Sequence, residues 1–173
     1  MDTLSLCFHV LFATILVGPQ VLLFYAVIPS TWLIEDEGLR RSVVQVVTRR
    51  FGVLSGISLV GLLITGLYQF YSDDIVPPAV RDNMMDYRWG LVFSTKMTAL
   101  VILVVLIAVH GMVFGKRIRL ASEAVQRGEG DPGALEAARR TSMMFSTLIL
   151  LVSVAVMFLG VTLGYAGYSE VPR

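Results

Sequence analysis

The sequence has very few of the residues that most catalytic and metal sites use. Among its 173 residues there is one cysteine, Cys7, and there are two histidines, His9 and His110. A single cysteine excludes an internal disulfide and a CxxC redox motif. The chain also lacks a phosphate-binding loop, an HExxH motif and a pattern that supports a Ser–His–Asp triad. No common class of soluble enzyme is therefore indicated by a motif.

Formal charge is missing from four long segments of the chain. The 14 basic and 13 acidic residues all lie outside residues 3–34, 51–72, 97–115 and 141–169. A soluble domain would carry charge along each amphipathic helix. Each segment is instead long enough for a helix that crosses ~30 Å of hydrocarbon, which takes roughly 18–20 residues. The pattern excludes an ordinary soluble enzyme, a nucleic-acid-binding protein and a disordered chain, and it predicts a polytopic membrane protein.

We predict an all-α fold, a single domain built as a bundle of four transmembrane helices. The spans are expected at about residues 5–33, 52–71, 92–115 and 142–165. A membrane β-barrel is excluded, because its strands alternate in polarity over about ten residues. The first segment is not expected to be a removable signal peptide, because no basic region precedes its long apolar run and no small-residue cleavage pattern follows it.

The basic residues predict an orientation in the membrane. Residues 35–50 contain four arginines, and residues 116–140 contain six lysines and arginines. The other side of the membrane would hold only Arg81, Arg88, Lys96 and Arg173. Lysine and arginine concentrate in cytoplasmic loops. Both strongly basic segments are therefore predicted to be cytoplasmic, with the N-terminus and the C-terminus outside.

The cytoplasmic segments also have helical patterns. Apolar residues within 39–47 share one face of a helix that would run into the second span. After a break at Gly130, Asp131 is a good helix N-cap and Pro132 suits the first helical position. We therefore predict helical cytoplasmic extensions, with a hairpin at about residues 116–141. The polar segment between the second and third spans is expected to be a loop.

Small residues recur at helical spacing in two spans. Gly52 and Gly56 open the second span, and Gly160 and Gly164 lie late in the fourth. In lipid such residues let helix backbones approach closely. They predict packing within the bundle, and they leave open a homo-oligomer or a larger membrane complex as partners besides the lipid bilayer. Pro19 is expected to kink the first span.

Ionisable groups inside a membrane span are costly, so each is a candidate functional residue. His9 and Lys96 lie near the outer starts of the first and third spans. They would form an outer polar site. His110 lies roughly 9 Å inside the inner end of its span, at 1.5 Å per residue. Arg49 and Arg50 lie at the same inner boundary.

These depths limit how a haem could be held. On straight helices His9 and His110 are separated by roughly 20–25 Å along the bilayer normal, which disfavours one haem bound by both histidines. A haem b held by His110, alone or with a sulfur from Met144 or its neighbour Met143, fits better. Arg49 and Arg50 would then neutralise the propionates, since arginine pairs with carboxylates.

Other interpretations stay open from the residues alone. His110 could be a neutral imidazole bonded to a nearby serine or threonine, and His9 and Lys96 could reach water or headgroups. Copper could bind at His9, His110 and methionines, as in a copper-handling membrane protein. The chain could also be an accessory subunit of a larger membrane complex, without a cofactor of its own.

Three local patterns resemble those of a known superfamily. They are Phe8–His9–Val10 followed by Gly18–Pro19, Arg49–Arg50–Phe51 followed by Ile64–Thr65–Gly66–Leu67–Tyr68, and Lys96 followed by His110–Gly111 and Phe114–Gly115–Lys116–Arg117. Together they resemble the CopD/HemJ-like four-helix integral membrane proteins over about residues 5–120.

The resemblance implies a small all-helical protein of the bacterial inner (plasma) membrane. In the HemJ-like branch such a protein binds b-type haem and oxidises a porphyrinogen, whereas in the CopD-like branch it helps copper to cross the membrane. The residues that would carry over are His9, Arg50, Lys96 and His110, with Arg49 adjacent.

Overall fold

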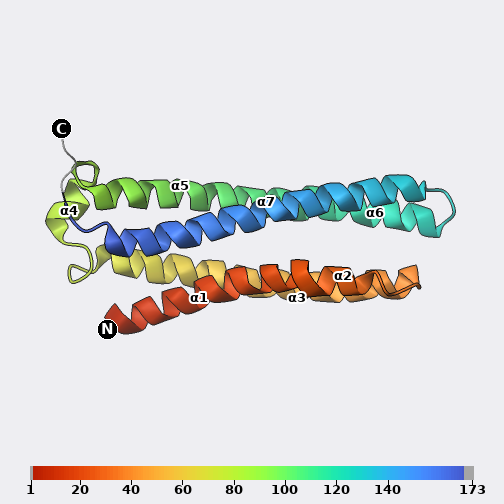
Figure 1. Ribbon diagram of the computed structural model, residues 1–173, viewed down its shortest axis with the longest axis horizontal. Helices are drawn as coiled ribbons and strands as arrows, with labels where there is room; N and C mark the ends of the chain where they lie inside the picture. The colour runs from red at the N-terminus through yellow and green to blue at the C-terminus, as the bar shows by residue number, and fades with distance from the viewer. Residues whose placement is uncertain (1, 170–173) are drawn as a thin grey trace. The chain divides into compact units, whose positions relative to one another are not determined.

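The protein has an all-α fold in residues 2–169, the part of the chain that the computed structural model describes (Figure 1). Four of its helices are long and apolar enough to cross a membrane. They are Asp2–Thr31, Gly38–Tyr71, Arg88–Gln126 and Pro132–Tyr165. At most 17% of the most apolar window of each helix is buried within the chain. An all-α chain with four candidate membrane spans is therefore confirmed, and Arg173 lies outside the described residues.

The chain divides into two compact units, which meet in sequence between Gly90 and Leu91. Unit 1 contains α1 (Asp2–Leu22), η1 (Leu23–Val27), α2 (Ile28–Thr31), α3 (Glu37–Tyr71), α4 (Pro78–Asp82) and η2 (Met84–Asp86). Unit 2 contains α5 (Arg88–Val109), η3 (His110–Phe114), α6 (Gly115–Gln126) and α7 (Pro132–Tyr165). The first turn of α5 still belongs to unit 1. Each unit is built on a pair of antiparallel membrane-length helices.

In unit 1, α1 and α3 pack along most of the length of α1 (Figure 1). Their register follows from two hydrogen-bonded pairs, Asp2 with Ser72 and His9 with Thr65. A step of seven residues toward the C-terminus on α1 thus corresponds to a step of seven residues toward the N-terminus on α3. A repeat of seven keeps the same face of each helix at the contact, as in a coiled coil. We call this contact the α1–α3 seam.

The helix pair of unit 2 has the same kind of register. His110 lies against Ser146, and Lys96 lies against Gly160, fourteen residues away on each helix. Midway between these two layers Leu103 is only 1% exposed. The backbones of α6 and α7 pack closely. At Lys96, on α5, it is the lysine side chain that lies next to α7.

The turn between α6 and α7 agrees with its prediction. The Asp131 carboxylate accepts hydrogen bonds from the backbone N–H groups of Gly133 and Ala134, and Pro132 occupies the first turn of α7. Gly128 has a φ of +74°, a left-handed conformation that glycine adopts without steric cost. The predicted N-cap and the turn near Gly130 are confirmed. Likewise, α3 starts at Glu37 and continues without a break into the second candidate span.

One local feature differs from the sequence-based expectation. The segment expected to be a loop contains the short helices α4 and η2, because Pro78 suits a first helical turn and Val76 and Val80 provide apolar anchors that are buried. The α-helical geometry of α1 continues through Pro19. The departure from α geometry comes afterwards, in the π-helix η1.

Candidate functional site

His110 lies at the junction of α5 and the π-helix η3, facing α7 within unit 2. Its ring stacks on Phe145 with ring centroids 6.0 Å apart and planes 7° apart. Phe114, one turn later, stacks on the same imidazole at 5.9 Å. The two phenyl rings are themselves 4.8 Å apart. Two apolar rings, Phe114 from η3 and Phe145 from α7, thus pack against the imidazole.

The two nitrogens of His110 have different surroundings. Nε2 lies 3.2 Å from the hydroxyl oxygen of Ser146. Nδ1 is buried and has no hydrogen-bond partner among the described residues. Unpartnered buried nitrogens are rare, because an unmade hydrogen bond costs about 1–3 kcal/mol. Among the described residues of this unit, Nδ1 of His110 and Oγ of Ser122 are the two buried side-chain atoms without a hydrogen-bond partner.

The backbone at His110 is also unusual. Residues His110–Phe114 form a π-helix inside an otherwise continuous helical run. Single π-helical turns are rare and are frequently found at functional sites. The same type of turn occurs in unit 1 at Leu23–Val27, where the segment contains no ionisable side chain except Tyr25. In η3 the π-turn coincides with the histidine.

Met144 lies close to His110 in register but on another face of α7. Its side chain is 68% exposed, whereas Phe145 and Ser146 are the α7 residues that contact the imidazole. Side chains two positions apart on a helix do not share a face. The Met144 sulfur is thus directed away from the surroundings of the imidazole that the helix pair forms.

Arg49 and Arg50 lie on α3 in unit 1, and both are exposed. Neither makes an ion pair with an acidic side chain of the described chain. Two adjacent unpaired guanidinium groups at the end of a charge-free segment are available to carboxylate or phosphate groups.

His9 is placed in unit 1 and is held by α3. Its Nδ1 lies 2.7 Å from the Thr65 hydroxyl, and its Cε1 is 3.4 Å from the position that a Cβ would take on Gly66. The imidazole is therefore half-buried in the α1–α3 seam. The structure brings His9 together with Thr65 and Gly66, which belong to the sequence pattern at the end of the second span.

Lys96 belongs to unit 2 and extends sideways toward α7. Its Nζ lies 3.6 Å from the position of a Cβ on Gly160. The missing side chain at Gly160 leaves space for the lysine. No acidic residue of α7 lies at this level, since residues 141–169 contain none. The ammonium group thus packs against a helix that offers no carboxylate.

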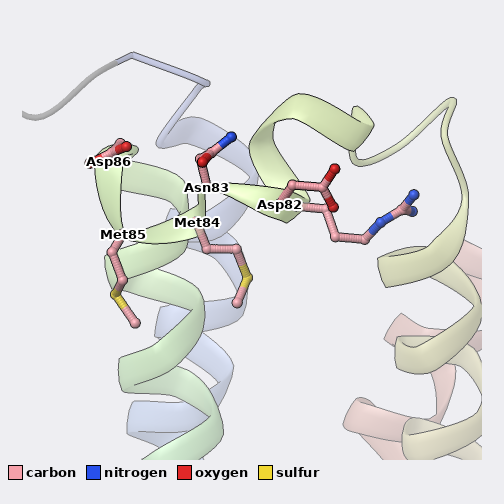
Figure 2. Close-up of a pocket in the computed structure, with 6 residues that line it drawn as sticks. Asp82, Asn83, Met84, Met85 and Asp86 are labelled. Carbon is pink, nitrogen blue, oxygen red and sulfur yellow. The ribbon is translucent and has the colours of Figure 1, made fainter.

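A shallow pocket of about 380 Å³ lies on the segment that joins the two units in sequence (Figure 2). Arg81, Asp82, Asn83, Met84, Met85 and Asp86 line it. Figure 2 shows these side chains spread over α4 and η2. None of the predicted site residues lines this pocket. Within residues 2–169, no group of three or more His, Cys, Asp or Glu side chains is placed to hold a metal ion.

The residues that contact the two histidines were not among the predicted site residues. These are Thr65 beside His9, and Phe114, Phe145 and Ser146 beside His110. For Ser146 the sequence held one signal, a repeat of seven residues. Ser146, Ser153 and Gly160 are evenly spaced along the fourth span, which indicates one shared helix face. Comparison with known proteins adds no relative, since no family model, curated protein or solved structure matches this chain.

Proposed function

We propose that this chain is a multi-pass redox protein of the bacterial inner membrane that binds haem b at His110, and that it belongs to the CopD/HemJ-like superfamily. The observation that carries the proposal is the buried and unpartnered Nδ1 of His110, with Phe114 and Phe145 stacked on the ring. A histidine that ligates a cofactor is expected to have such an unpartnered nitrogen when the cofactor is absent.

The donor set is suited to haem. A porphyrin supplies four of the iron ligands, so one imidazole is enough to anchor it. A metal-binding histidine commonly donates the N–H of its other nitrogen to a polar neighbour, which sets the tautomer. If Nε2–H of His110 donates to Ser146, the lone pair of Nδ1 would be the one available to hold the iron.

The sequence predicts roles for other residues toward a haem. Arg49 and Arg50, exposed and without acidic partners, are the candidates for the two propionates. Met144 is the candidate for a sulfur ligand, and its exposed side chain would have to turn toward the cofactor. Bound haem b would supply one-electron oxidation and reduction.

The proposal includes the orientation and the partners of the protein. The distribution of basic residues favours an orientation with the α6–α7 turn in the cytoplasm and both termini outside. The glycine-containing helix faces are candidates for contacts with a second copy or with another membrane protein. A fluorescent protein inserted at Glu129 should therefore fluoresce in cells, whereas a periplasmic reporter inserted there should be inactive.

A visible spectrum tests the haem assignment. We expect protein purified in detergent from haem-supplemented cells to show a Soret band that shifts on reduction and a reduced α band. His110→Ala should lose both bands, whereas His9→Ala, the matched change in the other unit, should keep them. A colourless wild-type preparation, or a His110→Ala variant with full haem content, would overturn the proposal.

Metal analysis of the same sample separates the alternatives. Stoichiometric copper without haem would replace the haem proposal by a copper-handling function at His9, His110 and the methionines. A sample without any metal, which co-purifies with another membrane protein, would instead support an accessory subunit.

A further inference from the structure

The α1–α3 seam is polar at the end where α1 begins. The Asp2 carboxylate accepts hydrogen bonds from the Ser72 hydroxyl at 3.1 Å and from the Tyr68 hydroxyl at 3.3 Å. One turn further along, the Gln69 side-chain amide donates to the Ser5 hydroxyl at 3.4 Å. Two successive layers of the seam are therefore joined by polar side chains, where two membrane helices would ordinarily pack apolar groups.

The polar character continues for one more layer and is then interrupted. His9 and Thr65 form the third polar layer, with 2.7 Å between Nδ1 and Oγ1. In the next layer the ring of Phe12 lies directly over Gly61. A Cβ added to Gly61 would lie only 2.5–2.6 Å from three atoms of that ring. Phe12 thus fills the seam at this level and separates what lies on its two sides.

Beyond Phe12 the seam becomes polar again. Ser58 is 1% exposed and Ser55 is 7% exposed, and neither hydroxyl oxygen has a hydrogen-bond partner in the described chain. Serines and threonines in a helix commonly donate to the carbonyl four residues earlier, as Thr65 does to Gly61. Ser55 and Ser58 make no such bond. Two buried hydroxyls in the apolar part of a membrane helix are thus left without partners.

The register places Gln20 at this level. Because His9 lies opposite Thr65, Leu16 falls opposite Ser58, and Gln20 falls one turn further, near Ser55. Gln20 is 6% exposed, so its amide faces protein and not lipid. Its Nε2 donates to the Leu16 carbonyl at 3.0 Å.

Pro19 leaves one backbone carbonyl group at the same level without its usual hydrogen-bond donor. In an α-helix the carbonyl of Ile15 would accept a hydrogen bond from the backbone N–H of residue 19, and proline has none. One carbonyl oxygen and two hydroxyl groups thus lack their usual partners within about two helical turns. All of them are small neutral groups that bind water.

We propose that ordered water binds in the seam between Gln20, Ser55 and Ser58, behind the Phe12 ring, and we call this site the water pocket. This water exchanges with the aqueous phase through the polar layers that begin at Asp2 and Ser72. The physical reason is the cost of leaving hydroxyl and carbonyl groups unbonded where no bulk water can reach them. A buried water typically makes two to four hydrogen bonds, and this pocket offers that number. The Phe12 layer acts as an apolar constriction, which water crosses rarely.

This inference does not depend on haem, since all its residues lie in unit 1 and it concerns water. It assigns a role to His9 as well. The imidazole is the last ionisable group on the open side of Phe12, so it exchanges protons with the aqueous phase through the polar layers above it.

Water-edited solid-state NMR on the full chain in bilayers of deuterated lipid tests the pocket. The protein carries ¹⁵N-glutamine, and the Gln20 side-chain signal is the one missing from a Gln20→Leu variant. We expect polarisation to pass from water to the Gln20 amide in the wild type, and to pass several-fold more slowly in Ser55→Ala/Ser58→Ala. A wild-type Gln20 signal that receives no water polarisation would show a dry pocket and overturn the proposal.

Hydrogen–deuterium exchange of the same Gln20 side chain tests the barrier. Phe12→Ala should speed exchange by about tenfold, the change that corresponds to a barrier lowered by ~1.4 kcal/mol. Phe158→Ala is the matched control, because Phe158 is 61% exposed on α7 and faces away from any seam. Equal exchange rates in the wild type and in Phe12→Ala would overturn the assignment of Phe12 as the constriction.

Discussion

Oγ1 of Thr65 lies 2.7 Å from Nδ1 of His9. The same hydroxyl is also 2.7 Å from the carbonyl oxygen of Gly61, which can only accept a hydrogen bond. A hydroxyl has one proton, so it cannot donate to both atoms. Both contacts are satisfied when Thr65 donates to Gly61 and His9 donates from Nδ1. This arrangement selects the Nδ1–H tautomer of the neutral imidazole.

The tautomer of His9 can be measured directly. We expect ¹⁵N chemical shifts of the neutral imidazole at alkaline pH to show a protonated Nδ1 and a deprotonated Nε2. Thr65→Val should remove this preference, because valine has the shape of threonine without the hydroxyl. Thr48→Val is the control, since Thr48 bonds only backbone carbonyls on α3. A wild-type His9 with its proton on Nε2 would contradict the assignment.

Ser146 should tune the cofactor site without being a ligand. Removing the polar neighbour of a metal-binding histidine typically weakens cofactor or metal affinity by about 10–100-fold. We therefore expect Ser146→Ala to lower haem affinity by this factor and to shift the midpoint potential, as measured by haem titration and redox potentiometry. Thr147→Val should behave like the wild type, because Thr147 bonds only the Met143 carbonyl. Unchanged haem affinity in Ser146→Ala would argue against a haem at His110.

Gly61 should be sensitive to an added side chain. An added Cβ would overlap the Phe12 ring, and overpacking of this kind typically costs about 1–3 kcal/mol. We expect Gly61→Ala to lower the stability of the protein in mixed-micelle denaturation by that amount. In Gly61→Ala/Phe12→Ala the added penalty should largely disappear. Gly52→Ala is the control, because no atom lies within 4 Å of its added Cβ.

The N-cap of α7 should contribute measurably to stability. The Asp131 carboxylate satisfies two backbone N–H groups at the start of a membrane-length helix. Loss of such a cap typically costs about 0.5–2 kcal/mol. We expect Asp131→Ala to destabilise the protein within this range, and Asp131→Asn to recover most of the loss. Glu136→Gln, a change in an exposed side chain on the same helix, should have a much smaller effect in the same assay.

Much of the fold could be predicted from the sequence because lipid imposes a simple rule. Charged side chains are costly in hydrocarbon, so the long segments without charged residues mark the candidate spans. The N-cap at Asp131 was also predictable, because capping depends on a few neighbouring residues. The segment before α5 was harder to predict, since α4 and η2 are stabilised by buried anchors such as Val76 and Val80.

The candidate site was predictable only in part. The sequence by itself determined which ionisable groups lie in the apolar segments, namely His9, Lys96 and His110, because composition along the chain decides what enters the bilayer. Only the tertiary structure decided their neighbours. Whether His110 meets Ser146 depends on the register between two helices, and a shift of one residue rotates each side chain by about 100°. That register is set by packing along the whole helix pair and not by any local pattern.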